Sequence, residues 1–147
     1  MALFATLISS LASAACPADG LSQVENAALE ADSARALELI EELEPVFGCR
    51  RRRPSEVARL HLARVAALFF DGEAASAEVS LRRARQAHPT LFDDRYGKRL
   101  RALWDVPLAT PSATLVPTNL PTRTVLLVDG SRWRPQDGPL HAGPRLV

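Results

Sequence analysis

The sequence has few of the residues that mark a metal site, a reaction centre or a nucleic-acid surface. Among 147 residues there are three histidines and two cysteines, and only 5% of the residues are aromatic. His61, His88 and His141 are scattered, which does not match the spacing of metal ligands, and no phosphate-binding glycine loop is visible. The formal net charge of +1 gives no overall field to attract nucleic acid. We therefore expect no cofactor, no metal and no nucleic-acid partner.

The first fifteen residues carry no charged side chain. An apolar run over 2–11 is followed by small residues at 12–15, which is the pattern of a secretory signal peptide. The run is shorter than the about 20 apolar residues that a membrane-spanning helix needs. We therefore predict that residues 1–15 are a signal peptide and that the mature chain is periplasmic or secreted.

The two cysteines leave alternatives open. In an oxidising compartment an even pair favours one disulfide, here between Cys16 and Cys49. Cys16 also follows directly after the small residues of the leader, so a lipid-anchored envelope protein acylated on Cys16 is an alternative. Ser13 and Pro17 depart from the usual lipoprotein signal. A third alternative is a pair of free thiols, if the leader is retained in a reducing cytosol.

Charge is segregated along the chain. Residues 19–44 contain eight acids and one arginine, a net charge of −7, whereas residues 50–64 contain six arginines and one acid, a net charge of +5. Segments of opposite sign either pair on folding or present a surface with both signs. We take Arg51 and Arg52 as candidate partner-contacting residues, and a solvated loop as the alternative.

Apolar residues recur every three or four positions over most of the first hundred residues, which is typical of one-sided helices. We predict helices over about 19–31, 33–47, 54–70 and 73–88, paired as two antiparallel hairpins. Asp32 or Ser33 can cap the second helix, and Pro54 suits the first turn of the third. A weaker terminal helix is predicted over 93–104, with Gly97 inside it.

The last forty residues have a different character. Four prolines fall within 107–122, and each removes a backbone donor, so this stretch cannot be a helix. Thr124–Val128 is a candidate strand and Asp129-Gly130 a hairpin signal. We predict a helical domain over 16–106, a Pro-rich linker over 107–123 and a β-hairpin tail over 124–147. Trp133 in the tail is a third candidate partner contact, unless it docks on its own helices.

The second predicted hairpin has the turn glycine, small helix-contact residues and closing proline of a known repeat, at matching spacings: Gly72, Ala77, Leu81, Ala84 and Pro89. In these residues it resembles a tetratricopeptide repeat. The resemblance implies stacked helical hairpins that contact proteins or peptides. The stretch Val125–Gly130 resembles the start of a PEGA-type module, a small β-rich domain of extracytoplasmic bacterial proteins.

These observations predict a mainly α-helical protein without enzymatic activity. The leading hypothesis is an extracytoplasmic adaptor or assembly subunit that binds a protein or peptide, with a homo-oligomer as one form of assembly. The first alternative is an envelope-anchored structural lipoprotein that associates with the membrane through its leader or Cys16. The second is a small hydrolase, which would require His61 or His88 beside a carboxylate in a pocket.

Overall fold

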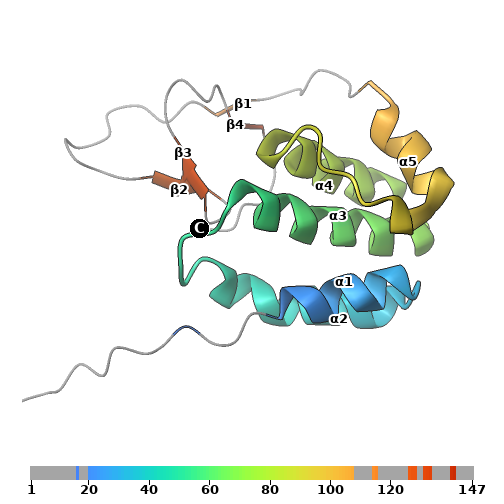
Figure 1. Ribbon diagram of the computed structural model, residues 1–147, viewed down its shortest axis with the longest axis horizontal. Coiled ribbons are helices and arrows are strands. Elements are labelled where there is room, and N and C mark those ends of the chain that lie inside the picture. Colours follow the sequence, from blue (N-terminus) through green and yellow to red (C-terminus); the bar gives the residue numbers. More distant parts are fainter. Residues whose placement is uncertain are drawn as a thin grey trace, which may run out of the picture.

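The computed structural model describes Cys16, residues 20–107 and four short strands (Figure 1). Its helical elements are α1 (Leu21–Leu29), α2 (Ser33–Phe47), α3 (Pro54–Phe70), α4 (Ala74–Ala87), the 3-10 helix η1 (Asp94–Tyr96) and α5 (Gly97–Asp105). The described part of the chain is therefore mainly α-helical, as the sequence predicts. None of its helices is both long enough and apolar enough to cross a membrane.

Local sequence signals set the helix boundaries. The Asp32 carboxylate accepts a hydrogen bond from the Arg35 backbone N–H at 3.1 Å and so caps α2, as predicted. Pro54 is the first residue of α3, where its missing N–H has no helical partner to lose. Glu56 completes this N-terminus by accepting a hydrogen bond from the Arg53 backbone N–H at 2.7 Å.

Left-handed backbone conformations reverse the chain between helices. Ala31 has a φ of 58° between α1 and α2, and Gly72 has a φ of 86° between α3 and α4. A Cβ atom at Gly72 would meet nothing within 4 Å, so glycine is favoured there by its backbone freedom and not by lack of space. This is the turn that the sequence assigned to Gly72.

The helices form two layers with α3 in the centre (Figure 1). Helices α1 and α2 form one layer, and α3 and α4 lie above them. α3 packs against α1, α2 and α4, and nine of its residues are buried. Four of these are alanines, Ala58, Ala63, Ala66 and Ala67, whose small side chains let neighbouring helices approach closely. The apolar core therefore extends through both layers.

The fifth helix differs from the sequence prediction. A continuous helix over 93–104 was expected, but the segment divides into η1 and α5 because Gly97 adopts a φ of 85°. Trp104 on α5 is only 6% exposed and packs into the core. The Arg85 guanidinium of α4 donates to the carbonyls of Trp104 at 3.2 Å and Val106 at 2.8 Å, which fastens the end of α5 to α4.

Four short strands follow the helices. β1 (Thr114–Leu115) pairs antiparallel with β4 (Leu140–His141), and β2 (Leu126–Val128) pairs antiparallel with β3 (Ser131–Trp133). The predicted leader over 1–15, and the predicted linker and tail apart from these strands, lie outside the described residues.

Candidate functional site

A groove of about 540 Å³ lies between the two layers of helices, beside the segment that precedes α5. α1 contributes Glu25, and α3 contributes Arg59 and Leu62. The rest of its wall comes from one short stretch: Leu91, Phe92, Asp93, Asp94, Arg95 and Tyr96. Segments distant in the sequence thus meet at one site, which is how a helical scaffold forms a binding groove.

One wall of the groove is an ion pair between the two layers. The Arg59 guanidinium donates from Nε to Oε1 of Glu25 at 2.6 Å and from Nη2 to the other carboxylate oxygen. The Glu25 side chain is 10% exposed and the Arg59 side chain 43% exposed. The hydrogen bond to Glu25 raises the pKa of Arg59 above its ordinary value. This two-point contact fixes both side chains in one orientation.

A second ion pair lies within the stretch 91–96 that lines the groove. The Arg95 guanidinium donates from Nη2 to Oδ2 of Asp93 at 2.6 Å, and the Arg95 backbone N–H donates to Oδ1 at 3.0 Å. The bond from the Arg95 side chain lowers the pKa of Asp93, so its carboxylate stays ionised. Asp93 also caps η1 through the backbone bond. Charge and local backbone structure therefore position this wall together.

Tyr96 lies near both ion pairs. It is only 7% exposed. Burial raises the pKa of its phenol, and the nearby carboxylates of Glu25 and Asp93 raise it further. Tyr96 is a neutral hydroxyl at physiological pH, able to donate or accept a hydrogen bond.

The remaining wall of the groove is apolar and firmly supported. Leu62 is 1% exposed, and Leu91 and Phe92 pack against the core. The Phe92 ring lies 5.5 Å from the Trp104 ring, between centroids, and the Arg101 guanidinium carbon lies 4.7 Å from the Phe92 centroid. The groove thus combines an apolar wall with fixed charges and one hydroxyl.

The sequence alone did not identify this groove. Its charged residues are separated by up to seventy positions, and each looks like an ordinary solvent-facing residue of its own segment. One signal was available: the short stretch 91–96 combines two apolar residues, two acids, an arginine and the single tyrosine of the chain.

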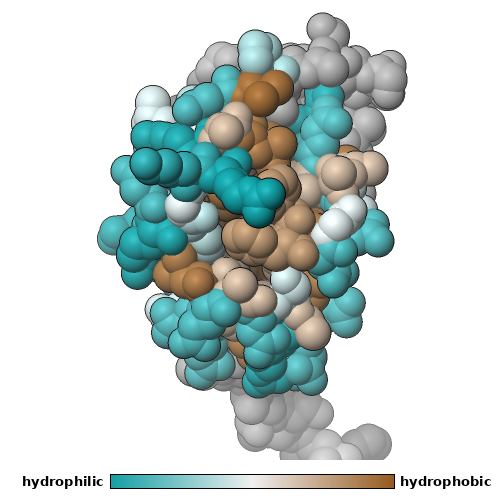
Figure 2. Space-filling view, turned by 90° about the vertical axis from the view of Figure 1, so that its right-hand side faces the viewer, coloured by the Kyte–Doolittle hydropathy of each residue, from teal (hydrophilic) through white to brown (hydrophobic). Residues whose placement is uncertain are grey.

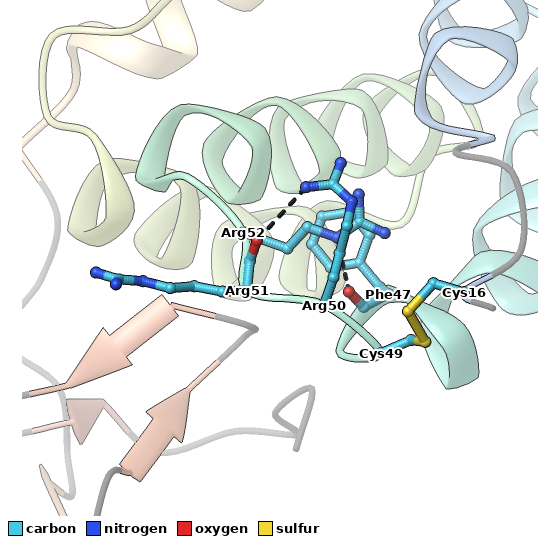
Figure 3. Close-up of a disulfide and its surroundings, with 6 residues drawn as sticks. All are labelled: Cys16, Phe47, Cys49, Arg50, Arg51 and Arg52. Atoms are coloured by element: carbon cyan, nitrogen blue, oxygen red, sulfur yellow. Dashed lines mark hydrogen bonds between the residues drawn. A yellow bond between two sulfur atoms is a disulfide. The ribbon is translucent and has the colours of Figure 1, made fainter. Parts of the chain in front are cut away.

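The predicted disulfide is present: Cys16 and Cys49 are bonded across a sequence separation of 33 residues (Figure 3). The bond ties the chain that precedes α1 to the loop that follows α2. Both cysteines are exposed to solvent. The Cys16 sulfur is therefore occupied by Cys49 and is not available as a thiol.

Two of the predicted partner contacts, Arg51 and Arg52, have different surroundings (Figure 3). Arg51 is exposed and extends away from the disulfide. Arg52 is only 4% exposed; its Nε donates to the Phe47 carbonyl at 2.7 Å, and its guanidinium carbon lies 4.2 Å from the centroid of the Phe47 ring. Arg52, which the sequence suggested as a partner contact, is therefore buried within this chain and holds the loop after α2.

The residues of the repeat resemblance lie in α4 and in the turns on either side of it. Three of them face inward from α4 and are at most 1% exposed: Ala77, Leu81 and Ala84. Pro89 follows the end of α4 and is exposed. Trp133, the third predicted partner contact, belongs to β3, and its side chain lies outside the described structure.

The groove has no histidine in its wall. His61 is fully buried in α3, and His88 follows the end of α4. The hydrolase alternative required a histidine beside a carboxylate in a pocket, and among the residues that line this groove there is none.

The chain matches no family model, no curated protein and no solved structure.

Proposed function

We propose that this chain is an extracytoplasmic adaptor without enzymatic activity, and that it binds a peptide segment of another protein in the groove between α1, α3 and residues 91–96. The groove is the observation that carries the proposal. An apolar wall bordered by polar groups is the usual anatomy of a protein interface. Its charges are oriented before any ligand arrives, which lowers the entropic cost of binding.

The chemistry of the walls favours a peptide over a small substrate. Leu62, Leu91 and Phe92 offer a surface for apolar side chains. Tyr96 offers a neutral hydroxyl close to the carboxylate of Glu25, and peptide amides and carbonyls can bond to such groups. Both guanidiniums of the wall are bonded to carboxylates, which limits their use as catalytic acids.

The architecture that we propose is a short stack of two antiparallel helical hairpins, similar to tetratricopeptide repeats, with a terminal helix and a β-hairpin tail. The packing of α1 on α2 and of α3 on α4 supports it. A stack of this kind buries one face of each hairpin and leaves a groove for recognition.

Export is supported by two independent features. The uncharged leader has the pattern of a signal peptide, and a disulfide persists in oxidising compartments. Acylation would need the same Cys16 sulfur that is bonded to Cys49. The disulfide therefore favours a soluble exported form over the lipid-anchored alternative.

The test is selection of binding peptides from a displayed random library, followed by the effect of one groove variant on their affinity. Leu91→Glu places a charge on the apolar wall and should weaken the selected peptides by about tenfold or more, because it removes apolar contact. Val79→Glu is the matched control: Val79 is 37% exposed on α4 and does not line the groove, so affinity should not change.

Circular dichroism would verify that both variants keep the helical content of the wild-type chain. Failure to select any peptide above background would overturn the proposal. Equal affinity of Leu91→Glu and wild-type chains would overturn the assignment to this groove.

A further inference from the structure

The Tyr96 hydroxyl is a polar group of the groove that the chain leaves without a partner. Tyr96 lines the groove, and its side chain is only 7% exposed. In the described part of the chain, no residue donates a hydrogen bond to this hydroxyl or accepts one from it. Because a largely buried polar group is costly to leave unbonded, a ligand that supplies the missing hydrogen bond is favoured.

The electrostatic field at this hydroxyl selects the sign of the ligand's charge. Burial has the largest effect in raising the pKa of Tyr96, and the carboxylates of Glu25 and Asp93 raise it further. The guanidiniums of Arg95 and Arg59 lower it, but by less than the two carboxylates raise it. A field that disfavours negative charge on the phenol favours positive charge beside it. The hydroxyl therefore suits a cationic hydrogen-bond donor.

The remaining charges near the groove do not reverse this field. Asp94 is offset by Arg101, whose Nη2 lies 3.6 Å from Oδ1 of Asp94. Arg101 contacts the Phe92 ring at the border of the groove and does not line it. Lys98 and Arg99 of α5 are exposed and also lie outside the lining. The field at the hydroxyl is thus set by the groups of the two ion pairs.

The bonds already made by the two carboxylates favour an ammonium over a guanidinium. Glu25 receives a two-point contact from Arg59, which leaves about two of its four lone-pair sites. Asp93 accepts from the Arg95 side chain and backbone N–H, so most of its sites are used. A second guanidinium could not repeat a two-point contact on Glu25, whereas an ammonium has three separate donors that can each use a single site.

The apolar wall beside these polar groups suits a long aliphatic stem. Leu62, Leu91 and Phe92 form this wall. A lysine side chain lays its methylenes along apolar surface while its charge reaches polar groups, whereas the ammonium of a peptide N-terminus has no such stem. Apolar and hydrophilic side chains also adjoin one another on the end of the helical layers where α5 lies (Figure 2).

We infer that the groove binds a lysine side chain of the peptide. The lysine ammonium donates to the Tyr96 hydroxyl and to the Glu25 carboxylate, and its methylenes lie along the apolar wall. The inference rests on the proposed function, since it names the side chain that the bound peptide places in this groove.

Nuclear magnetic resonance titration of the disulfide-bonded chain with single capped amino acids tests the inference. N-acetyl-lysine N-methylamide should shift the backbone amide signals of Arg59, Leu91 and Tyr96. The corresponding norleucine derivative has the same stem without the ammonium, and it should bind about tenfold more weakly because charged hydrogen bonds are lost. The arginine derivative, and glycine N-methylamide with its free N-terminus, should each bind more weakly than the lysine derivative.

One variant removes the hydroxyl alone. Tyr96→Phe keeps the buried ring, and it should reduce the preference for lysine over norleucine by about threefold or more, since one charged hydrogen bond is lost. Glu78→Gln is the matched control: it removes a half-exposed carboxylate of α4 outside the groove and should leave the preference unchanged. Because the preference is a ratio of two affinities in one protein, a general loosening of the groove would not reproduce the effect.

Three results would overturn the inference. The first is equal affinity for the lysine and norleucine derivatives. The second is tighter binding of the arginine or glutamate derivative, or of glycine N-methylamide, than of the lysine derivative. The third is a preference for lysine that Tyr96→Phe leaves unchanged.

The proposed function can fail separately. Selected peptides that lack lysine and are weakened by Leu91→Glu would overturn the inference and leave the proposed function standing. Binding of the lysine derivative in the groove, with no peptide selected from the library, would overturn the proposed function and assign the groove to a free amine.

Discussion

The chain reverses differently at the two ends of the helical layers. We call the end with the α2–α3 connection the loop end, and the end with the α1–α2 and α3–α4 turns the turn end. At the loop end the chain is held by side chains and a covalent bond: the Cys16–Cys49 disulfide, the Arg52 contacts with Phe47, and the bonds to Glu56. At the turn end, positive φ angles at Ala31 and Gly72 reverse the chain, and the Asp32 carboxylate caps α2.

This difference separates side chains that hold the fold from side chains that are exposed. At the loop end the disulfide, Arg52 and Glu56 hold the connection, so their removal should destabilise the fold. The turn end depends mainly on backbone conformation, and Phe70 and its neighbouring carboxylates are exposed there. Substitutions at equivalent kinds of residue at the two ends should therefore affect different properties.

The largest expected effect is loss of the disulfide. Cys16→Ser/Cys49→Ser should lower the free energy of unfolding by about 3–4 kcal/mol, because the unfolded chain is no longer constrained by a closed loop of this length. The measurement is urea denaturation followed by far-ultraviolet circular dichroism.

Reduction provides the control for this prediction. The wild-type chain in reducing agent should match the double variant, and the variant should not respond to reducing agent. Equal stability of the variant and the oxidised wild type would show that the bond does not hold the loop end.

A smaller effect is expected from two neighbouring arginines. Arg52→Met should cost about 2 kcal/mol, because a buried charged hydrogen bond to the Phe47 carbonyl is lost while the length of the side chain is kept. Arg51→Met should change stability by less than about 0.5 kcal/mol, as is usual for an exposed side chain. Denaturation midpoints of the two variants, measured together, compare a fixed arginine with an exposed one.

Similar losses for both arginines would contradict this assignment, since Arg51 would then contribute to the fold. A negligible loss for Arg52→Met would mean that the Phe47 ring and the disulfide hold the loop without it.

The features that the sequence predicted are those set by neighbouring residues. Pro54 marked the start of α3, Asp32 the cap of α2, and the two cysteines their disulfide, because each signal acts within one segment or has a single partner. Gly97 was placed inside one predicted helix, and the sequence did not predict that its positive φ would separate η1 from α5.

The features that the sequence missed depend on packing between segments. Arg52 looked like its neighbours in a run of four arginines, and only the position of the Phe47 ring and carbonyl distinguishes it. The groove was missed for the same reason: Glu25 and Arg59 are 34 positions apart and meet only when α1 docks on α3. Charge segregation along the chain allowed either such pairs or a surface with both signs, and it did not indicate which residues would pair.

The smallest expected effect is a pH dependence at Glu56. Burial raises its pKa, but the hydrogen bond from the Arg53 backbone N–H, together with Arg50, outweighs burial and lowers the pKa below its ordinary value. A lowered pKa in the folded state means that ionised Glu56 stabilises the fold above its unfolded-state pKa, about 4.3. That contribution is lost as the pH falls through the lower, folded-state value.

Glu56→Gln should therefore cost about 1 kcal/mol at pH 7, as loss of a helix cap does, and it should flatten the decline in unfolding free energy below about pH 4.5. Asp93, whose pKa is also lowered, remains in both proteins, so the difference between the two pH profiles isolates Glu56. Glu73→Gln provides the comparison at the turn end and should leave stability at pH 7 unchanged, because Glu73 is an exposed side chain. If the profiles of the wild-type and Glu56→Gln chains have the same shape, Glu56 is not the carboxylate that fastens α3 to the loop end, and the contrast between the two ends rests on the disulfide and Arg52 alone.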